Sequence, residues 1–265
     1  RDDNNTLDIV AHEYAHLVTE TSAGLVYKKE QGALNESFSD IFGVACYEFN
    51  FGITNTIWLN GYDRTDVTNP NLHLVYRDLS NPKNYDQPDT YLGTNWYSTT
   101  GGYGDDNWGV HTNSGVQNYM FYLLVSGKDG VNENGWPYSV TGIGFNDARR
   151  IAYLALTAYL TNNSQYIDAR NAWVQAARTI FGSCSNQAIQ TGKAWEAVGL
   201  PSPASYNVVG NYTTTSNIQV NGTANLATPS PMTIQSGAQY SIGAKAVHML
   251  PGFKAFSGSY FHAYI

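Results

Sequence analysis

The pentapeptide His12-Glu13-Tyr14-Ala15-His16 organises this chain, because it places two imidazoles and a carboxylate within five residues. On an α-helix, residues i and i+4 lie one turn apart on the same face. Both ring systems can then reach one metal ion at about 2.0–2.1 Å. Glu13 stands beside the pair, where it can act on a water at the metal. The HExxH spacing therefore predicts a metal site with an adjacent general base.

The flanking residues predict the helix that carries this pentapeptide. Thr6 is a plausible N-cap and Gly24 is a C-cap signal. Between them apolar residues recur with helical spacing, at Val10, Ala11, Tyr14, Leu17 and Val18. We expect the opposite face of the helix to carry His12, Glu13 and His16.

A second helix is predicted from about Ala33 to Phe49, with Glu36 in its first turn. Nineteen residues separate His16 from Glu36, which is enough chain for the helix to turn back and bring Glu36 to the metal as a third ligand. Asp40, one turn further, can accept the N–H of a ligand histidine and fix its tautomer. The alternative is an exposed acidic helix start, which the helix dipole favours.

Residues 8–43 resemble the active-site segment of thermolysin-type zinc neutral metallopeptidases, and the similarity continues to about Leu200. The string from Asn35 to Asp40 (Asn-Glu-x-x-x-Asp) favours this group over aminopeptidases that share HExxH and a distant glutamate. The resemblance implies a Zn²⁺ site and a reaction in which Glu13 takes the proton of a metal-activated water as it attacks a peptide carbonyl. The implied zinc ligands are His12, His16 and Glu36, with Asn35 and Asp40 behind them.

The resemblance also assigns residues that stabilise the tetrahedral intermediate. His111, in the segment from Asp105 to Gly115, matches the histidine that donates a hydrogen bond to the oxyanion. Asp106 would orient this histidine, and Tyr27 matches the tyrosine that helps to hold the same oxyanion.

Three further residues are assigned to substrate binding by the same resemblance. Arg77 matches the arginine that hydrogen-bonds the carbonyl on the primed side of the scissile bond. Tyr76 and Ile9 would border the pocket for the side chain after the cut, which the family reserves for apolar groups. The alternative for Arg77 is a surface arginine in a turn.

Calcium is implied in a reduced or rearranged form. Asp8 matches a calcium ligand of the family, but the next acidic ligand aligns with Tyr47, and Glu48 is one residue out of step. A shift of one residue rotates a helical side chain by about 100°. Calcium takes six to eight oxygen ligands, and Asp63 and Asp66 are the other acids nearby.

The expected fold class is α+β, with residues 1–200 as the mainly α-helical C-terminal lobe of a thermolysin-like catalytic domain whose N-terminal β lobe is largely absent. Helices are expected over about 145–161, 165–181 and 184–198. Residues 201–204 form a linker, and 205–265 show short β-rich runs broken by Gly, Asn and Pro. This tail is similar to small stacked-strand modules at the C-termini of some secreted bacterial proteins, where its role could be export, attachment or fold capping.

Composition narrows the class of partner. The chain has 265 residues, 13% of them charged, and a net charge of −7, so a nucleic-acid partner is not expected. No apolar run approaches the length of a membrane span. Cys46 and Cys184 are compatible with one disulfide or with two buried thiols. No signal peptide opens the chain, so we expect a longer precursor that carries a propeptide and the β lobe.

These observations together predict a secreted, extracellular zinc-dependent endopeptidase that acts on proteins or peptides before bulky apolar residues. The alternative is a non-catalytic metal-bearing module for binding or cell-surface attachment through the tail.

Overall fold

The computed structural model describes residues 6–62, 73–100 and 104–200 in full, together with the backbone of short strands between residues 212 and 264. Contacts divide the chain into two units, Arg1–Leu200 and Pro201–Ile265, which are described separately. The expected linker at 201–204 and the acids Asp63 and Asp66 lie outside the described residues.

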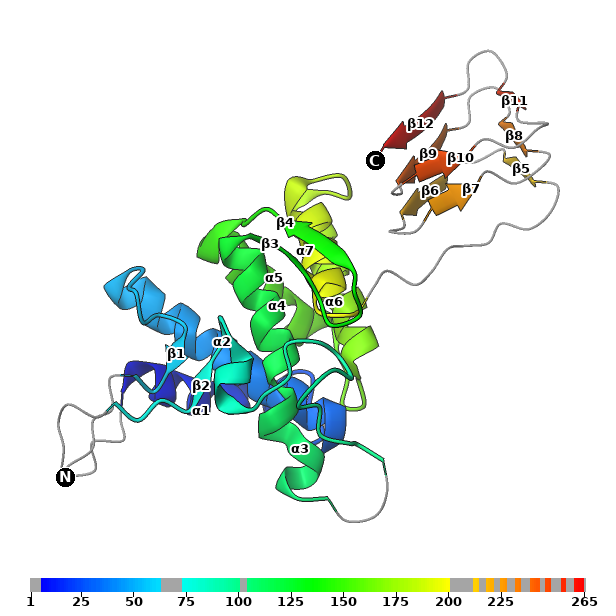
Figure 1. Cartoon of the computed structure of the whole chain (residues 1–265). Helices are drawn as coiled ribbons and strands as arrows, with labels where there is room; N and C mark the ends of the chain where they lie inside the picture. Colours follow the sequence, from blue (N-terminus) through cyan, green and yellow to red (C-terminus); the bar gives the residue numbers. More distant parts are fainter. Residues whose placement is uncertain are drawn as a thin grey trace. The chain divides into compact units, whose positions relative to one another are not determined.

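The first unit is mainly helical (Figure 1). Its helices are α1 (Leu7–Thr21), α2 (Lys29–Phe51), α3 (Asp106–Asn113), α4 (Gly115–Ser126), α5 (Gly144–Leu154), α6 (Tyr166–Phe181) and α7 (Asn186–Ala197). A π-helical turn (Ala155–Tyr159) follows α5, and a 3₁₀ turn spans Pro82–Tyr85. Two antiparallel pairs complete the unit: β1 (Leu59–Asn60) with β2 (Arg77–Asp78), and β3 (Lys128–Val131) with β4 (Pro137–Val140).

Most of the expected elements are present, with shifted ends. The helices expected over 165–181 and 184–198 are confirmed as α6 and α7. The helix expected over 145–161 divides instead into α5 and the π-helical turn. The region from Ser126 to Thr141 contains the β3–β4 hairpin.

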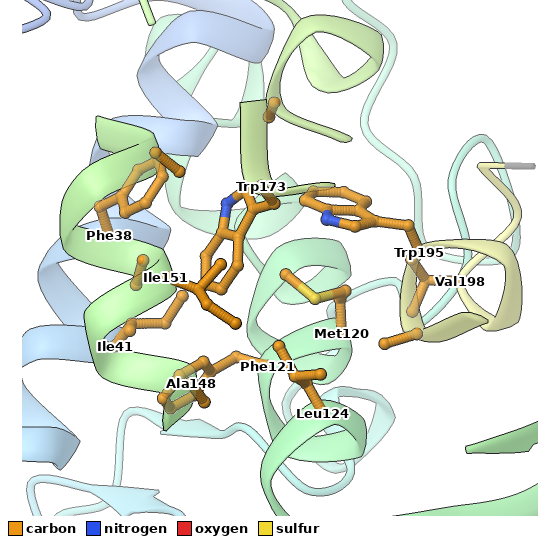
Figure 2. Packing of buried hydrophobic residues seen from close by; sticks show 14 of the residues in the cluster. Phe38, Ile41, Met120, Phe121, Leu124, Ala148, Ile151, Trp173, Trp195 and Val198 are labelled. Atoms are coloured by element: carbon orange, nitrogen blue, oxygen red, sulfur yellow. The ribbon is translucent and has the colours of Figure 1, made fainter. Parts of the chain in front are cut away.

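Helix α4 runs through the core, with α2, α5, α6 and α7 packed around it (Figures 1 and 2). Trp173 of α6 stacks on Phe38 of α2, with ring centroids 5.8 Å apart, and packs edge-on against Phe121 of α4. Each such ring, fully buried, contributes about 1.5–3 kcal/mol of hydrophobic free energy. This packing fixes α2, which carries Glu36 and Asp40.

Helix α1 lies directly on α2, and the contact depends on a glycine. A Cβ atom at Gly43 would lie 2.6 Å from the backbone oxygen of Asp8 and 3.6 Å from the Cβ of His12. Real side chains do not approach backbone so closely, so any larger residue would push α1 away. The glycine therefore sets the height of the HExxH helix above α2.

The buried face of α1 differs from the simple reading of its apolar spacing. Val10, Tyr14 and Leu17 are 49%, 67% and 49% exposed. The buried residues of α1 are instead Asp8, His12, Ala15 and Thr19. Asp8 and His12 on this face have polar partners inside, the Gly61 N–H after α2 and Asp40 on α2.

The second unit consists of short parallel strands: β5 (Tyr212–Thr214), β6 (Ile218–Asn221), β7 (Asn225–Ala227), β8 (Met232–Ile234), β9 (Gln239–Gly243), β10 (Ala246–His248), β11 (Lys254–Ala255) and β12 (Tyr260–Tyr264). They form three ladders, β5-β8-β11, β6-β9-β12 and β7-β10. Partner residues such as Asn225 and Ala246 are about 21 positions apart in each ladder. A repeat of this length in parallel register is typical of a solenoid.

Candidate active site

Two histidines from α1 and one glutamate from α2 converge at the centre of the site. The Nε2 atoms of His12 and His16 are 3.1 Å apart, and each lies 3.5 Å from a carboxylate oxygen of Glu36. Ligands at 2.0–2.1 Å in a tetrahedron around zinc are separated by about 3.3–3.4 Å. The His12 distance is to Oε2 and the His16 distance to Oε1, and one ligand atom from each of the three residues lies within 4.8 Å of the others, so the three side chains can share one ion.

The state of Glu36 supports a cation at this point. Its side chain is 1% exposed, and Oε2 has no hydrogen-bond partner among the described residues. A buried acceptor without a donor costs about 1–3 kcal/mol, and more when it is charged. A bound Zn²⁺ would satisfy this oxygen, and two imidazoles with one carboxylate are a donor set that catalytic zinc sites use. His12, His16 and Glu36 fit the metal.

Residues of α2 orient both histidine rings from behind. Asp40 Oδ1 lies 2.9 Å from Nδ1 of His12. Asn35 Oδ1 and Ser39 Oγ lie 2.7 Å and 3.1 Å from Nδ1 of His16. Because each Nδ1 is engaged, each Nε2 is turned toward Glu36. Asn35 and Asp40 lie where they were expected; Ser39 was missed, although its spacing of four residues from Asn35 places both on one helix face.

Asp40 is also the centre of a buried ion pair. Arg77, at the start of β2, donates to it through Nε and Nη2, both at 2.7 Å, and Asn118 of α4 donates at 2.8 Å. Burial alone would raise the pKa of Asp40, but the charges of Arg77 and His12 outweigh burial and lower it. Burial alone would lower the pKa of His12, yet the contact with Asp40 leaves it raised.

The ion pair between Arg77 and Asp40 was not predicted from the sequence. The expected contact between Arg77 and substrate stays a prediction, and in the described part of the chain Nη1 is the guanidinium nitrogen without a hydrogen bond. Asn118 was not singled out either, because nothing in the local sequence links α4 to Asp40.

His111 and Tyr27 stand on the open side of the triad. Asp106 Oδ1 lies 2.5 Å from Nδ1 of His111, and its Oδ2 accepts the backbone N–H of the same residue at 2.9 Å. Nε2 of His111 is 3.4 Å from Glu36 Oε1 and 3.3 Å from the hydroxyl of Tyr27. The Tyr27 hydroxyl donates to Glu36 Oε1. Burial and the charge of Glu36 raise the pKa of Tyr27, so its hydroxyl remains a donor.

The backbone before His111 is unusual. Asp106, Asn107, Trp108 and Gly109 have φ values of 53°, 49°, 65° and 74°, which form one left-handed turn. The Gly109 N–H donates to the Asp105 carbonyl at 3.2 Å, as in a helix of the opposite hand. A left-handed residue other than glycine costs roughly 1–2 kcal/mol. Such strain persists where surrounding structure over-determines it, often at functional sites.

The remaining candidates are less closely tied to the centre. Glu13 is exposed on α1, beside His12, and Ile9 is half-buried on the same helix. Tyr76 is 47% exposed, and its ring lies against Gly61. The grouping of Ile9 and Tyr76 around one pocket stays a prediction.

The two candidate calcium ligands, Asp8 and Glu48, contact different partners. Asp8 is buried, accepts the Gly61 N–H at 2.6 Å and lines a cavity of about 10 Å³ together with Tyr47. Glu48 instead pairs with Arg149 of α5, 3.3 Å away. The assignment of Asp8 and Glu48 to a calcium site stays a prediction.

Cys46 and Cys184 are not joined to each other by a disulfide. Within the described residues, no helix is both long and apolar enough to cross a membrane.

Comparisons with known proteins agree on the first unit. Residues 23–200 match the family model described as "Thermolysin metallopeptidase, alpha-helical domain". Bacillolysin from Brevibacillus brevis and thermolysin from Alicyclobacillus acidocaldarius are 43% and 42% identical over 195 residues, 73% of this chain. The neutral protease NprE of Bacillus pumilus is 40% identical over 199 residues, 74% of this chain.

The solved precursor of protealysin, a metalloproteinase from Serratia proteamaculans, superposes with a TM-score of 0.52 and 29% identity over 73% of this chain and 57% of its own. The match spans 33% of the length of the bacillolysin and thermolysin relatives and 55% of NprE. The chain therefore belongs to the thermolysin metallopeptidase family, and residues 23–200 correspond to the alpha-helical domain of that family.

Proposed function

We propose that this chain is the catalytic part of a zinc-dependent endopeptidase, with Glu13 as its general base. The observation that supports this best is the triangle of His12, His16 and Glu36, in which one buried carboxylate oxygen has no donor among the described residues. The presence of His111 and Tyr27 on the open side favours catalysis over a non-catalytic metal-bearing module, because such a module needs no donors there.

Zinc bound to the triad would act as a Lewis acid that acidifies water and polarises the peptide carbonyl. Glu13 accepts the proton of the attacking water and later delivers it to the leaving nitrogen. His111, with Nδ1 held by Asp106, donates from Nε2 to the developing oxyanion, and the Tyr27 hydroxyl donates beside it. In the absence of substrate both groups face Glu36 Oε1.

Substrate binding is proposed to involve Arg77, Tyr76 and Ile9. Arg77 keeps Nη1 for a substrate carbonyl while Asp40 holds its other two nitrogens. The exposed ring of Tyr76 and the half-buried Ile9 would border a pocket for a bulky apolar side chain after the scissile bond, which gives cleavage before such residues.

The setting of the enzyme is also a proposal. We infer a secreted, extracellular protein made as a precursor with a propeptide and a β lobe, since the curated relatives are much longer than the matched region. Residues 205–265, after a linker at 201–204, are proposed as an all-β module for export or surface attachment. Calcium near Asp8 would need ligands in addition to Glu48.

Three chains tested side by side examine the catalytic proposal: wild type, Glu13→Gln and Glu20→Gln. Glu20 is an exposed glutamate on the same helix and serves as a matched control. Each is loaded with zinc, analysed for metal content and assayed on quenched peptides with Leu, Phe or Asp after the expected cut. We expect one zinc in each, cleavage before Leu and Phe by wild type and Glu20→Gln, and about a 10²–10⁴-fold lower kcat in Glu13→Gln.

Full activity of Glu13→Gln would refute Glu13 as the base. Zinc bound at one equivalent without peptidase activity in the wild type would favour the alternative, a non-catalytic metal-bearing module.

A further inference from the structure

We propose that Trp108 is a positioning residue for His111: its indole, held between Lys29 and Gly104, keeps Asp106–Gly109 in the left-handed turn that directs Asp106 at His111. The kinetic part of this inference rests on the proposed function, in which His111 acts on the substrate.

The turn must be held from outside, because three of its four residues are not glycine. Asp106 and Asn107 are the residue types that tolerate this conformation best after glycine, but the bulky Trp108 adopts it as well. Released from its contacts, this segment would relax toward φ below zero. Asp106 could then no longer accept both the backbone N–H and the Nδ1 proton of His111, the two contacts that fix the ring.

The indole has a contact on each side that can provide this hold. The ammonium group of Lys29 lies 5.3 Å from the ring centroid, within the range of a cation–π interaction. A Cβ atom at Gly104 would lie 2.5 Å from the ring, so the bare glycine backbone forms the other wall. Trp108 is half-buried between them.

Helix α2 connects the contacts of Trp108 to the candidate metal ligands. Lys29 is the first residue of α2, and one turn later a Cβ atom at Gly32 would lie 2.4 Å from Cγ1 of Val110. Trp108 and Val110 therefore dock α3 on the first turn of α2, at residues 29 and 32. Glu36 follows one turn further along the same helix, so these contacts set the distance between His111 and Glu36.

The far side of the turn is closed as well. A Cβ atom at Gly109 would lie 2.5 Å from the Cβ of Tyr97, whose backbone N–H and carbonyl both bond the side chain of Asn113. The turn thus has a fixed wall on the Tyr97 side, and Trp108 supplies the contact on the α2 side.

A series at position 108 separates the ring from the backbone strain. Trp108→Phe keeps an aromatic face, Trp108→Ala keeps the strain without the ring, and Trp108→Gly removes both. With zinc-loaded full-length chains, we expect Trp108→Phe to retain kcat within about threefold, and Trp108→Ala and Trp108→Gly to lose about tenfold or more in kcat with KM within about twofold. Zinc content should be unchanged in all three.

Variants of Lys29, which contacts the indole ring, provide an independent test. Lys29→Met should lower kcat in the same direction by a smaller factor, and should add nothing in the Trp108→Ala background, because the two residues act through one contact. Lys28→Met, at the exposed neighbouring lysine, is the matched control and should behave as wild type.

A measurement that needs no turnover completes the test. The Nδ1 proton of His111 is followed by NMR in ¹⁵N-histidine-labelled protein, and is assigned by its loss in His111→Gln. We expect a downfield, exchange-protected signal in wild type and Trp108→Phe that is absent in Trp108→Ala and Trp108→Gly.

Wild-type kcat together with an unchanged Nδ1 signal in Trp108→Ala would overturn the positioning role while leaving the peptidase proposal standing. An inactive wild type whose Nδ1 signal still depends on Trp108 would refute the peptidase proposal and support the positioning role.

Discussion

Asp40 connects the candidate metal ligands to the rest of the protein. One buried carboxylate faces His12, receives two bonds from Arg77 and a third from Asn118 of α4. A buried charge that loses its partner destabilises a fold by about 3–5 kcal/mol, whereas an exposed pair contributes about 0–1 kcal/mol. Asp40 is therefore expected to matter for both stability and metal affinity.

Asp40→Asn leaves the guanidinium of Arg77 buried without its counter-charge. We expect the free energy of unfolding to fall by about 3–5 kcal/mol and zinc affinity to fall about 10–100-fold. Urea denaturation and competition with a fluorescent chelator measure the two effects. Asp147→Asn, which removes a partly exposed carboxylate 3.9 Å from Arg150, is the control and should change stability by less than about 1 kcal/mol.

The same carboxylate predicts a pH dependence of stability. Because the pKa of Asp40 is lowered in the folded state, its contribution is complete above the unfolded value of about 3.9 and is lost as pH falls through the lower folded value. Below about pH 4 the wild type should lose stability more steeply than Asp40→Asn. Parallel acid-unfolding slopes for the two proteins would contradict this.

At the level of single residues, the sequence predicts the grouping of the three candidate metal ligands but not the tertiary partners of Asp40. His12, His16 and Glu36 could be predicted because their geometry follows from helix spacing and one short turn. The pairing of Arg77 with Asp40 could not, since it joins residues 37 positions apart through a two-stranded sheet.

The close packing of α1 on α2 depends on Gly43, which has no side chain. At Gly43, alanine would raise helix propensity, but its Cβ would lie 2.6 Å from the Asp8 carbonyl. The carbonyl belongs to α1 and cannot rotate aside, so we expect the clash to prevail and to cost about 1–3 kcal/mol. Zinc affinity should fall as α1 moves. Gly192→Ala in α7, where nothing lies within 4 Å, should instead stabilise by about 0.5–1 kcal/mol.

Thermal unfolding and zinc titration of the two alanine variants decide this prediction. A Gly43→Ala protein as stable as Gly192→Ala would show that α1 can shift without cost.

The elements themselves were predictable where apolar periodicity governs them, as in α6 and α7. The start of α2 was placed four residues late, because Lys29 enters the helix with φ of 54° and without a side-chain cap. The left-handed turn at 106–109 was not predicted, because Trp108 at its third position is a bulky residue that rarely adopts such backbone, although Asp106, Asn107 and Gly109 are residue types that do. On α1, the apolar spacing predicts a buried face that is exposed in the structure. The opposite face is buried because Asp40 on α2 contacts His12.

At the level of the whole molecule, every described candidate site residue belongs to the unit that ends at Leu200. We therefore expect residues 1–200 to bind zinc with the same stoichiometry and affinity as the full chain. Calorimetric titration of both chains tests this, and a loss of binding in the shorter chain would mean that the tail contributes to the site.

Removal of the metal should destabilise that unit. A ligand present at a thousandfold excess over its Kd stabilises the folded state by about 4 kcal/mol. We expect 1,10-phenanthroline to lower the Tm of the full chain and the Tm of residues 1–200 equally. Added zinc should restore both Tm values. The Tm of His16→Ala should be the same with and without the chelator.

The ladders of the second unit have a consequence for how this protein can change length. Each coil of about 21 residues pairs only with the coil before or after it, so stability grows by neighbour terms and tolerates insertion or deletion of a whole coil. Relatives that gain or lose multiples of this period at their C-terminal ends are therefore expected to keep the first unit unchanged beside a longer or shorter second unit.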